Sequence, residues 1–108
     1  MKRVLLGFTA ISVAFSPAAF GQSAAEQKAL VEKYCVSCHN QRLKTANIIL
    51  DTADVSNVAA APDLWEKVVR KLHGGSMPPL GMPRPDKATL DGFASWLEAS
   101  PDPQRPAR

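Results

Sequence analysis

Apolar residues recur three or four positions apart in three stretches of the chain, which is the spacing of one face of an α-helix. The first stretch covers about residues 23–38, where Ser23 and Glu26 match the capping box that starts a helix. Its apolar stripe consists of Leu30, Val31, Tyr34, Cys35 and Cys38. We therefore predict a helix over residues 23–38 with both cysteines on its apolar face.

The second stretch predicts a helix over about residues 62–72. Pro62 suits the first helical position, and Glu66 forms a box-like pair with Asp63. Basic residues fill the last turn and a Gly-Gly pair ends it. Its apolar side consists of Leu64, Trp65, Val68, Val69 and Leu72. Trp65 is either a core residue, the commoner use, or a residue for partner docking or electron entry.

The third stretch predicts a helix that begins after Asp86, a good N-cap, and ends near Ser100. Its buried stripe consists of Leu90, Phe93, Ala94 and Leu97, and Trp96 at the edge is expected to pack on the first helix or a cofactor. Residues 40–61 have weak periodicity and predict a loop with a turn of helix, in which residues 48–50 are apolar. Three helices joined by loops predict the all-α fold class.

The N-terminus has the pattern of a secretory signal peptide. Two basic residues precede an apolar run over residues 4–15, and a Ser-Pro pair and small residues follow. We assign residues 1–22 to the signal peptide, with cleavage after Gly21 or after Ala25. Residues 23–100 then form one small domain, and residues 101–108, which contain three prolines, form a tail expected to be disordered.

Export changes what the charge implies. The formal net charge of +3 falls to +1 once the two basic residues of the signal peptide are removed. The remaining charges are scattered, so the cationic surface of a nucleic-acid-binding protein is missing. No second apolar stretch is long enough to span a bilayer. We expect a periplasmic protein without a transmembrane span once the signal peptide is removed, and its oligomeric state does not follow from the sequence.

The two cysteines lie in the sequence Cys35-Val36-Ser37-Cys38-His39. A Cys-x-x-Cys pair alone fits a thioredoxin-type redox pair, a structural disulfide or half of a zinc site. A histidine directly after the second cysteine gives the signature of covalent c-type haem attachment. This spacing lets both thiols reach one edge of a porphyrin while the imidazole faces the iron. We predict one haem c bound through Cys35 and Cys38, with His39 as an iron ligand.

A proline-rich segment over residues 73–85 contains the candidates for a second axial ligand. Four prolines between residues 78 and 85 forbid a helix and stiffen the chain, which suits a weakly bonding thioether. Met77, between two glycines and a Pro-Pro pair, is our first choice. Met82, in a Gly-Met-Pro setting, is the alternative distal ligand. His73 is a third candidate, although it fits the last turn of the second helix better.

These motifs resemble small class I bacterial cytochromes c over about residues 24–100. The stretches at residues 40–45, 50–51, 65–68 and 77–79 further resemble the N-terminal cytochrome domain of larger exported planctomycete and acidobacterial proteins. The resemblance implies a small cytochrome c-like fold of about three helices around one covalent haem. It also implies thioethers at Cys35 and Cys38, with His39 as proximal and Met77 as distal ligand.

Function follows from such a cofactor. His and Met together leave no open position on the iron and raise its reduction potential, which favours electron transfer over catalysis. We expect an exported electron carrier, not an enzyme, that serves redox protein partners in the periplasm. One alternative is an electron-relay haem module within a larger assembly. The other is an open-site haem sensor or peroxidase, if neither methionine binds.

Overall fold

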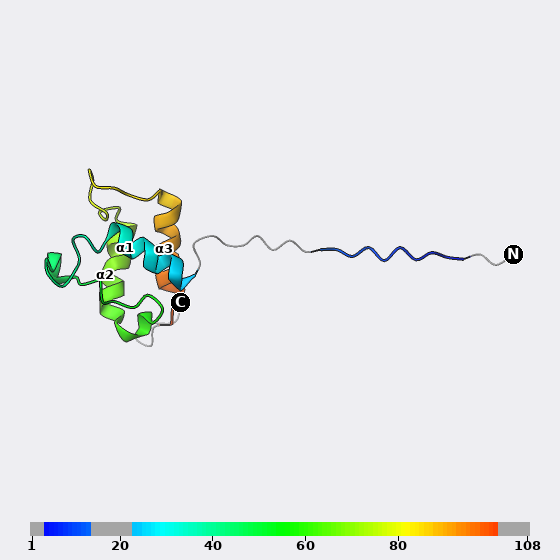
Figure 1. Cartoon of the computed structure of the whole chain (residues 1–108), viewed down its shortest axis with the longest axis horizontal. Helices are drawn as coiled ribbons and strands as arrows, with labels where there is room; N and C mark the ends of the chain where they lie inside the picture. The colour runs from blue at the N-terminus through cyan, green and yellow to red at the C-terminus, as the bar shows by residue number, and fades with distance from the viewer. Residues whose placement is uncertain (1–3, 14–22, 102–108) are drawn as a thin grey trace.

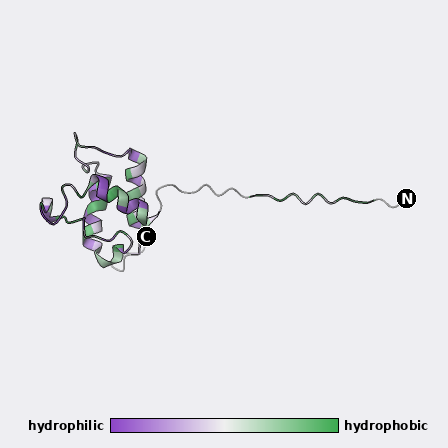
Figure 2. Ribbon diagram, in the orientation of Figure 1, coloured by the Kyte–Doolittle hydropathy of each residue, from purple (hydrophilic) through white to green (hydrophobic). Residues whose placement is uncertain are grey.

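The computed structural model describes residues 4–13 and 23–101 (Figure 1). Within them the regular elements are α1 (Ala24–Tyr34), η1 (Thr45–Asn47), η2 (Val58–Ala60), α2 (Pro62–His73) and α3 (Lys87–Ala99), where η denotes a 3-10 helix. The described residues contain no strand, so the all-α prediction is confirmed. Figure 2 shows hydrophobic and hydrophilic residues mixed along the three helices, as expected for helices that cover a core.

Helix α1 begins as predicted and ends earlier. The Ser23 hydroxyl accepts a hydrogen bond from the Glu26 amide at 3.1 Å. The predicted end at Cys38 is wrong, because α1 ends at Tyr34 and Cys35 is its C-cap. The side-chain amide of Asn40 donates to the Val36 carbonyl at 2.7 Å and thereby occupies an acceptor that a continuing helix would use. Both cysteines therefore bracket a turn that follows the helix.

Helix α2 spans the predicted stretch plus one residue, but it starts differently. The box-like pair of Asp63 and Glu66 is wrong as a cap, since Ala61 is the N-cap and no side chain caps the helix. Pro62 at the first helical position explains the difference, because it has the helical φ already and no N–H to satisfy. Asp63 lies in the first turn, where the helix dipole favours a carboxylate.

Helix α3 begins and ends where the sequence predicts. The Asp86 carboxylate accepts a hydrogen bond from the Thr89 amide at 2.7 Å. The same hydrogen bond holds the pKa of Asp86 below its usual value. All four residues of the predicted buried stripe are buried. The indole nitrogen of Trp96 donates to the Val55 carbonyl at 3.4 Å, in the loop before α2, and the expected packing of Trp96 on the first helix or a cofactor stays a prediction.

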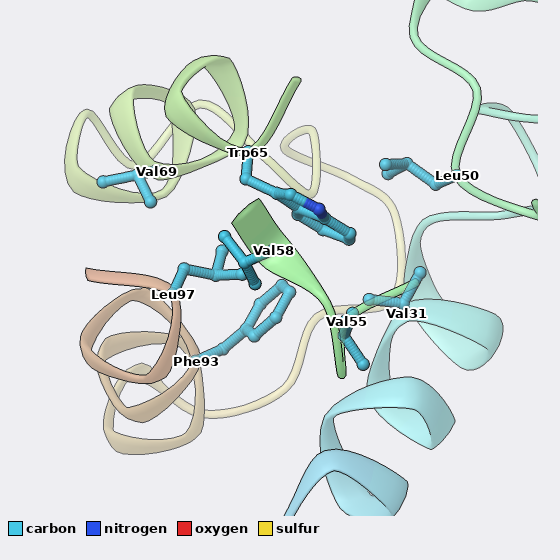
Figure 3. Packing of buried hydrophobic residues seen from close by; sticks show 8 residues of the cluster. All are labelled: Val31, Leu50, Val55, Val58, Trp65, Val69, Phe93 and Leu97. Atoms are coloured by element: carbon cyan, nitrogen blue, oxygen red, sulfur yellow. The ribbon is translucent and has the colours of Figure 1, made fainter. Parts of the chain in front are cut away.

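The core lies between α2, α3 and the loop that joins α1 to α2 (Figure 3). The rings of Trp65 and Phe93 meet edge to face, with centroids 6.4 Å apart and planes at 82°. Trp65 is 1% exposed, so its interpretation as a core residue is confirmed. The cluster of buried residues comprises Val31, Leu50, Val55, Val58, Trp65, Val69, Phe93 and Leu97. Residues 40–61 are thus a structured loop with two helical turns that contributes three of these residues.

Residues 4–13 form an extended segment without regular secondary structure, away from the helices (Figure 1). Apolar side chains in this segment, such as Leu5 and Phe8, are exposed. The cleavage site after Gly21 and almost all of the predicted tail over residues 101–108 lie outside the described residues. Among the described helices, none has the length and apolar character needed to cross a membrane.

Leu97 and Leu80 provide a matched test of this core. Leu97 is fully buried, whereas Leu80 is 88% exposed on the proline-rich loop. We expect Leu97→Ala to lower the free energy of unfolding by about 3 kcal/mol, from lost burial and the cavity left behind. Leu80→Ala should lower it by less than about 0.5 kcal/mol. Denaturant titrations of the purified protein measure both, and equal effects would contradict the assigned core.

Candidate functional site

His39 is held in one orientation by the chain around it. Its Nδ1 lies 3.0 Å from the Thr45 carbonyl oxygen, and its backbone N–H donates to the Cys35 carbonyl at 2.9 Å. A carbonyl oxygen only accepts hydrogen bonds, so Nδ1 must carry the proton. A neutral imidazole that donates from Nδ1 has its lone pair on Nε2. This is the tautomer and the support that a metal-binding histidine needs.

Cys35 and Cys38 lie directly before His39, in the turn that ends α1. Both are free thiols and both are half-buried. Burial raises the pKa of the Cys35 thiol to about 11. A thioredoxin-type pair works with a thiol pKa lowered below the ordinary value. The pKa of Cys35 is raised and not lowered, which disfavours the redox-pair interpretation of this motif.

The two methionines lie on a separate loop, between α2 and α3. Met77 is half-buried beside Pro78, which is buried. Met82 is 49% exposed and closes a turn through its N–H to the Pro79 carbonyl at 3.1 Å. Gly81 has φ of +86° within this turn, a conformation that favours glycine. Met77 is therefore the less exposed of these two methionines.

His73 and the zinc interpretation can be placed as well. His73 lies in the last turn of α2, as expected, and its Nε2 bonds to the Glu98 carboxylate of α3. It thus links two helices. Among residues 4–13 and 23–101, no group of three or more His, Cys, Asp or Glu side chains is arranged to hold a metal ion.

Trp65 carries an unusual polar atom. Its indole Nε1 is buried and has no hydrogen-bond partner among the described residues. Leaving a buried donor without an acceptor costs about 1–3 kcal/mol. Native proteins rarely contain such a group without a reason. A group that brings a hydrogen-bond acceptor to this indole would satisfy it.

Sequence reasoning missed the residues that support His39. The acceptor at Thr45 is a backbone carbonyl, which leaves no trace in the residue type. The sequence predicts only a loop at Asn40, yet the Asn40 side chain hydrogen-bonds to residues on both sides of His39. An Asn directly after the Cys-x-x-Cys-His motif is a turn-forming residue, and that was the available signal.

Comparison with known proteins identifies the family. A family model described as cytochrome C oxidase, cbb3-type, subunit III, matches residues 22–97. No curated protein matches the chain, and no solved structure does. The narrower resemblance to exported planctomycete and acidobacterial proteins stays a prediction. The match spans most of the chain and includes Cys35, Cys38 and His39. The chain therefore belongs to this family of class I c-type cytochrome domains and carries covalent haem c.

Proposed function

We propose that this protein is an exported mono-haem cytochrome that transfers single electrons between redox protein partners. The observation that carries the proposal is His39, whose Nδ1 is bonded to the Thr45 carbonyl so that Nε2 is free for iron. Cys35 and Cys38 beside it supply the two thiols for covalent attachment. When bound, the haem supplies an iron that takes up and releases one electron.

The core residues fit such a group. A haem brings two propionate carboxylates, which accept hydrogen bonds, and the Trp65 indole N–H needs an acceptor. A domain as small as this one is also only marginally stabilised by its own buried surface, so a cofactor in the core would add support. We propose that Trp65 donates to a propionate, and that Ile48 and Leu50 pack at the haem edge.

Met77 is the proposed distal ligand, with Met82 as the alternative. The half-buried position of Met77 beside buried Pro78 supports this choice, because a thioether binds iron weakly and needs a fixed backbone. Met82 is half-exposed at the tip of the loop. With His39 and Met77 bound, the iron has no open position, so we propose an electron carrier and not an enzyme.

A second candidate is an electron-relay subunit of a larger assembly. The description of the matching family, an oxidase subunit, favours it. For either function we propose export to the periplasm with residues 1–22 as signal peptide. Cleavage after Gly21 keeps Ser23, which caps α1, whereas cleavage after Ala25 removes it. We therefore favour cleavage after Gly21.

The first test expresses the full chain together with haem-maturation machinery. A haem-stained band on a denaturing gel, with a sharp reduced spectrum that carbon monoxide leaves unchanged, is the expected result. Ready binding of carbon monoxide would instead mean an open iron and a sensor or peroxidase. A band without stain would sink the proposal and leave Cys35 and Cys38 as ordinary thiols or a disulfide.

The distal ligand is tested by two methionine substitutions. We expect Met77→Ala to abolish the weak long-wavelength absorption that reports sulfur bonded to ferric iron, and to lower the reduction potential. Met82→Ala is the matched control and should retain both. The reverse pattern would assign Met82 as the ligand.

The acceptor for Trp65 is tested by Trp65→Phe. If a propionate accepts from the indole, the substitution strands a buried carboxylate, and the free energy of unfolding of the haem-loaded protein should fall by about 1–3 kcal/mol. Trp96→Phe, which removes only the long bond to Val55, is the control and should cost less. An unchanged or increased stability of Trp65→Phe would show that the indole has no such partner.

A further inference from the structure

Residues 39–51 form a loop whose two ends are joined, which we call the His39 loop. The Leu50 N–H donates to the His39 carbonyl at 2.9 Å, and the Gln41 N–H donates to the Asp51 carboxylate at 3.2 Å. Compact loops with adjoining ends are often functional. Thr45 lies inside this loop, and its carbonyl faces the ring of His39. The geometry of the loop therefore sets the position of the Thr45 carbonyl oxygen relative to the His39 ring.

The side chain of Asn40 hydrogen-bonds to the chain before His39 and to the chain after it. Its side-chain nitrogen donates to the carbonyls of Val36 at 2.7 Å and Ser37 at 3.3 Å. Both carbonyls lie in the turn at residues 35–38 that contains the two cysteines, which we call the cysteine turn. Its side-chain oxygen accepts from the amides of Arg42 at 3.0 Å and Leu43 at 2.9 Å, in the His39 loop. One amide group thus fastens the His39 loop to the cysteine turn.

The backbone beside Thr45 is strained. Lys44, Ala46 and Asn47 have φ of 48°, 54° and 57°, the left-handed region that is unfavourable for residues with a Cβ. Such conformations persist only where surrounding bonds fix them, and they gather at functional sites. The Lys44 N–H donates to the Asn40 carbonyl at 2.8 Å, so Asn40 also anchors this strained stretch.

The strained stretch gives the Thr45 carbonyl two donors. It accepts from the Ile48 N–H at 3.1 Å and from His39 Nδ1 at 3.0 Å. A carbonyl oxygen has two lone pairs, so both are used. The bond from the Ile48 N–H closes the turn at residues 45–48. The bond from His39 connects this turn to the imidazole ring. The strain therefore serves a bond outside the turn at residues 45–48.

We propose that Asn40 is a positioning residue that holds the Thr45 carbonyl against His39 and thereby sets the strength of His39 as an iron ligand. This rests on the proposed function, in which His39 binds the haem iron. A hydrogen bond from Nδ1 to a carbonyl makes the imidazole more basic. A more basic ligand favours ferric over ferrous iron and so lowers the reduction potential. Loss of the bond raises the potential.

The test compares Asn40→Ala with wild type in the haem-loaded full chain. Two quantities are measured: the reduction potential, and the rate at which the His39 Nδ1 proton exchanges with solvent in the ferrous protein by NMR. We expect a higher potential and exchange about fivefold faster, which is the factor one hydrogen bond contributes. Asn57→Ala is the matched control, because Asn57 makes no side-chain cap bond and lies in another loop. It should change neither quantity.

Asn40→Ser serves as the conservative variant, because a hydroxyl also donates and accepts over short range. We expect its potential and exchange rate to lie between wild type and Asn40→Ala. If Asn40→Ala yields no folded protein, the comparison of Asn40→Ser with wild type decides by the same signs. Lower stability with both quantities unchanged would overturn the proposal and leave Asn40 a structural residue. Wild type without covalent haem would instead remove the proposed function, and this inference with it.

Discussion

The hydrogen bond between His39 and the Thr45 carbonyl is the constraint around which the functional half of this protein is arranged. It fixes the tautomer of the ring and leaves one nitrogen for a metal. To make it, α1 must stop at Tyr34 and the chain must turn back on itself before entering the core at Leu50. Three features therefore position the groups of this one hydrogen bond. They are the end of α1 at Tyr34, the strained stretch at residues 44–47 and the buried Leu50.

The other half of the protein supplies the support. Helices α2 and α3 pack through Trp65 and Phe93, and they are joined again where His73 bonds to Glu98. This pair holds the loop that carries the methionines. Its core still contains an indole N–H without an acceptor, which is the kind of defect a buried cofactor corrects. The proposed function accordingly places the haem against this core.

Periodicity and end signals predicted the three helices because their apolar faces and caps are local in sequence. The predicted end of α1 was wrong because Cys35 and Cys38 continue the helical spacing in the sequence. In the structure, the side chain of Asn40 bonds to the Val36 carbonyl, which a longer helix would use. The cysteines and His39 were recognisable because haem attachment needs those residue types in that order. The Thr45 acceptor could not be recognised from the sequence, because every residue type has a backbone carbonyl. The glycines and the Pro-Pro pair around Met77 favoured it in the sequence, and its half-buried position adds support that the repeated Met-Pro pattern does not reveal.

The use of a backbone acceptor has a consequence for how this loop tolerates change. Most substitutions at position 45 keep the carbonyl, so the identity of that residue is nearly free. The number of residues is not free, because Asn40 and Asp51 tie down both ends of the segment. One inserted or deleted residue between them would present a different carbonyl, or none, to the ring. We therefore expect this loop to tolerate a change of residue type at position 45 better than a change in its length.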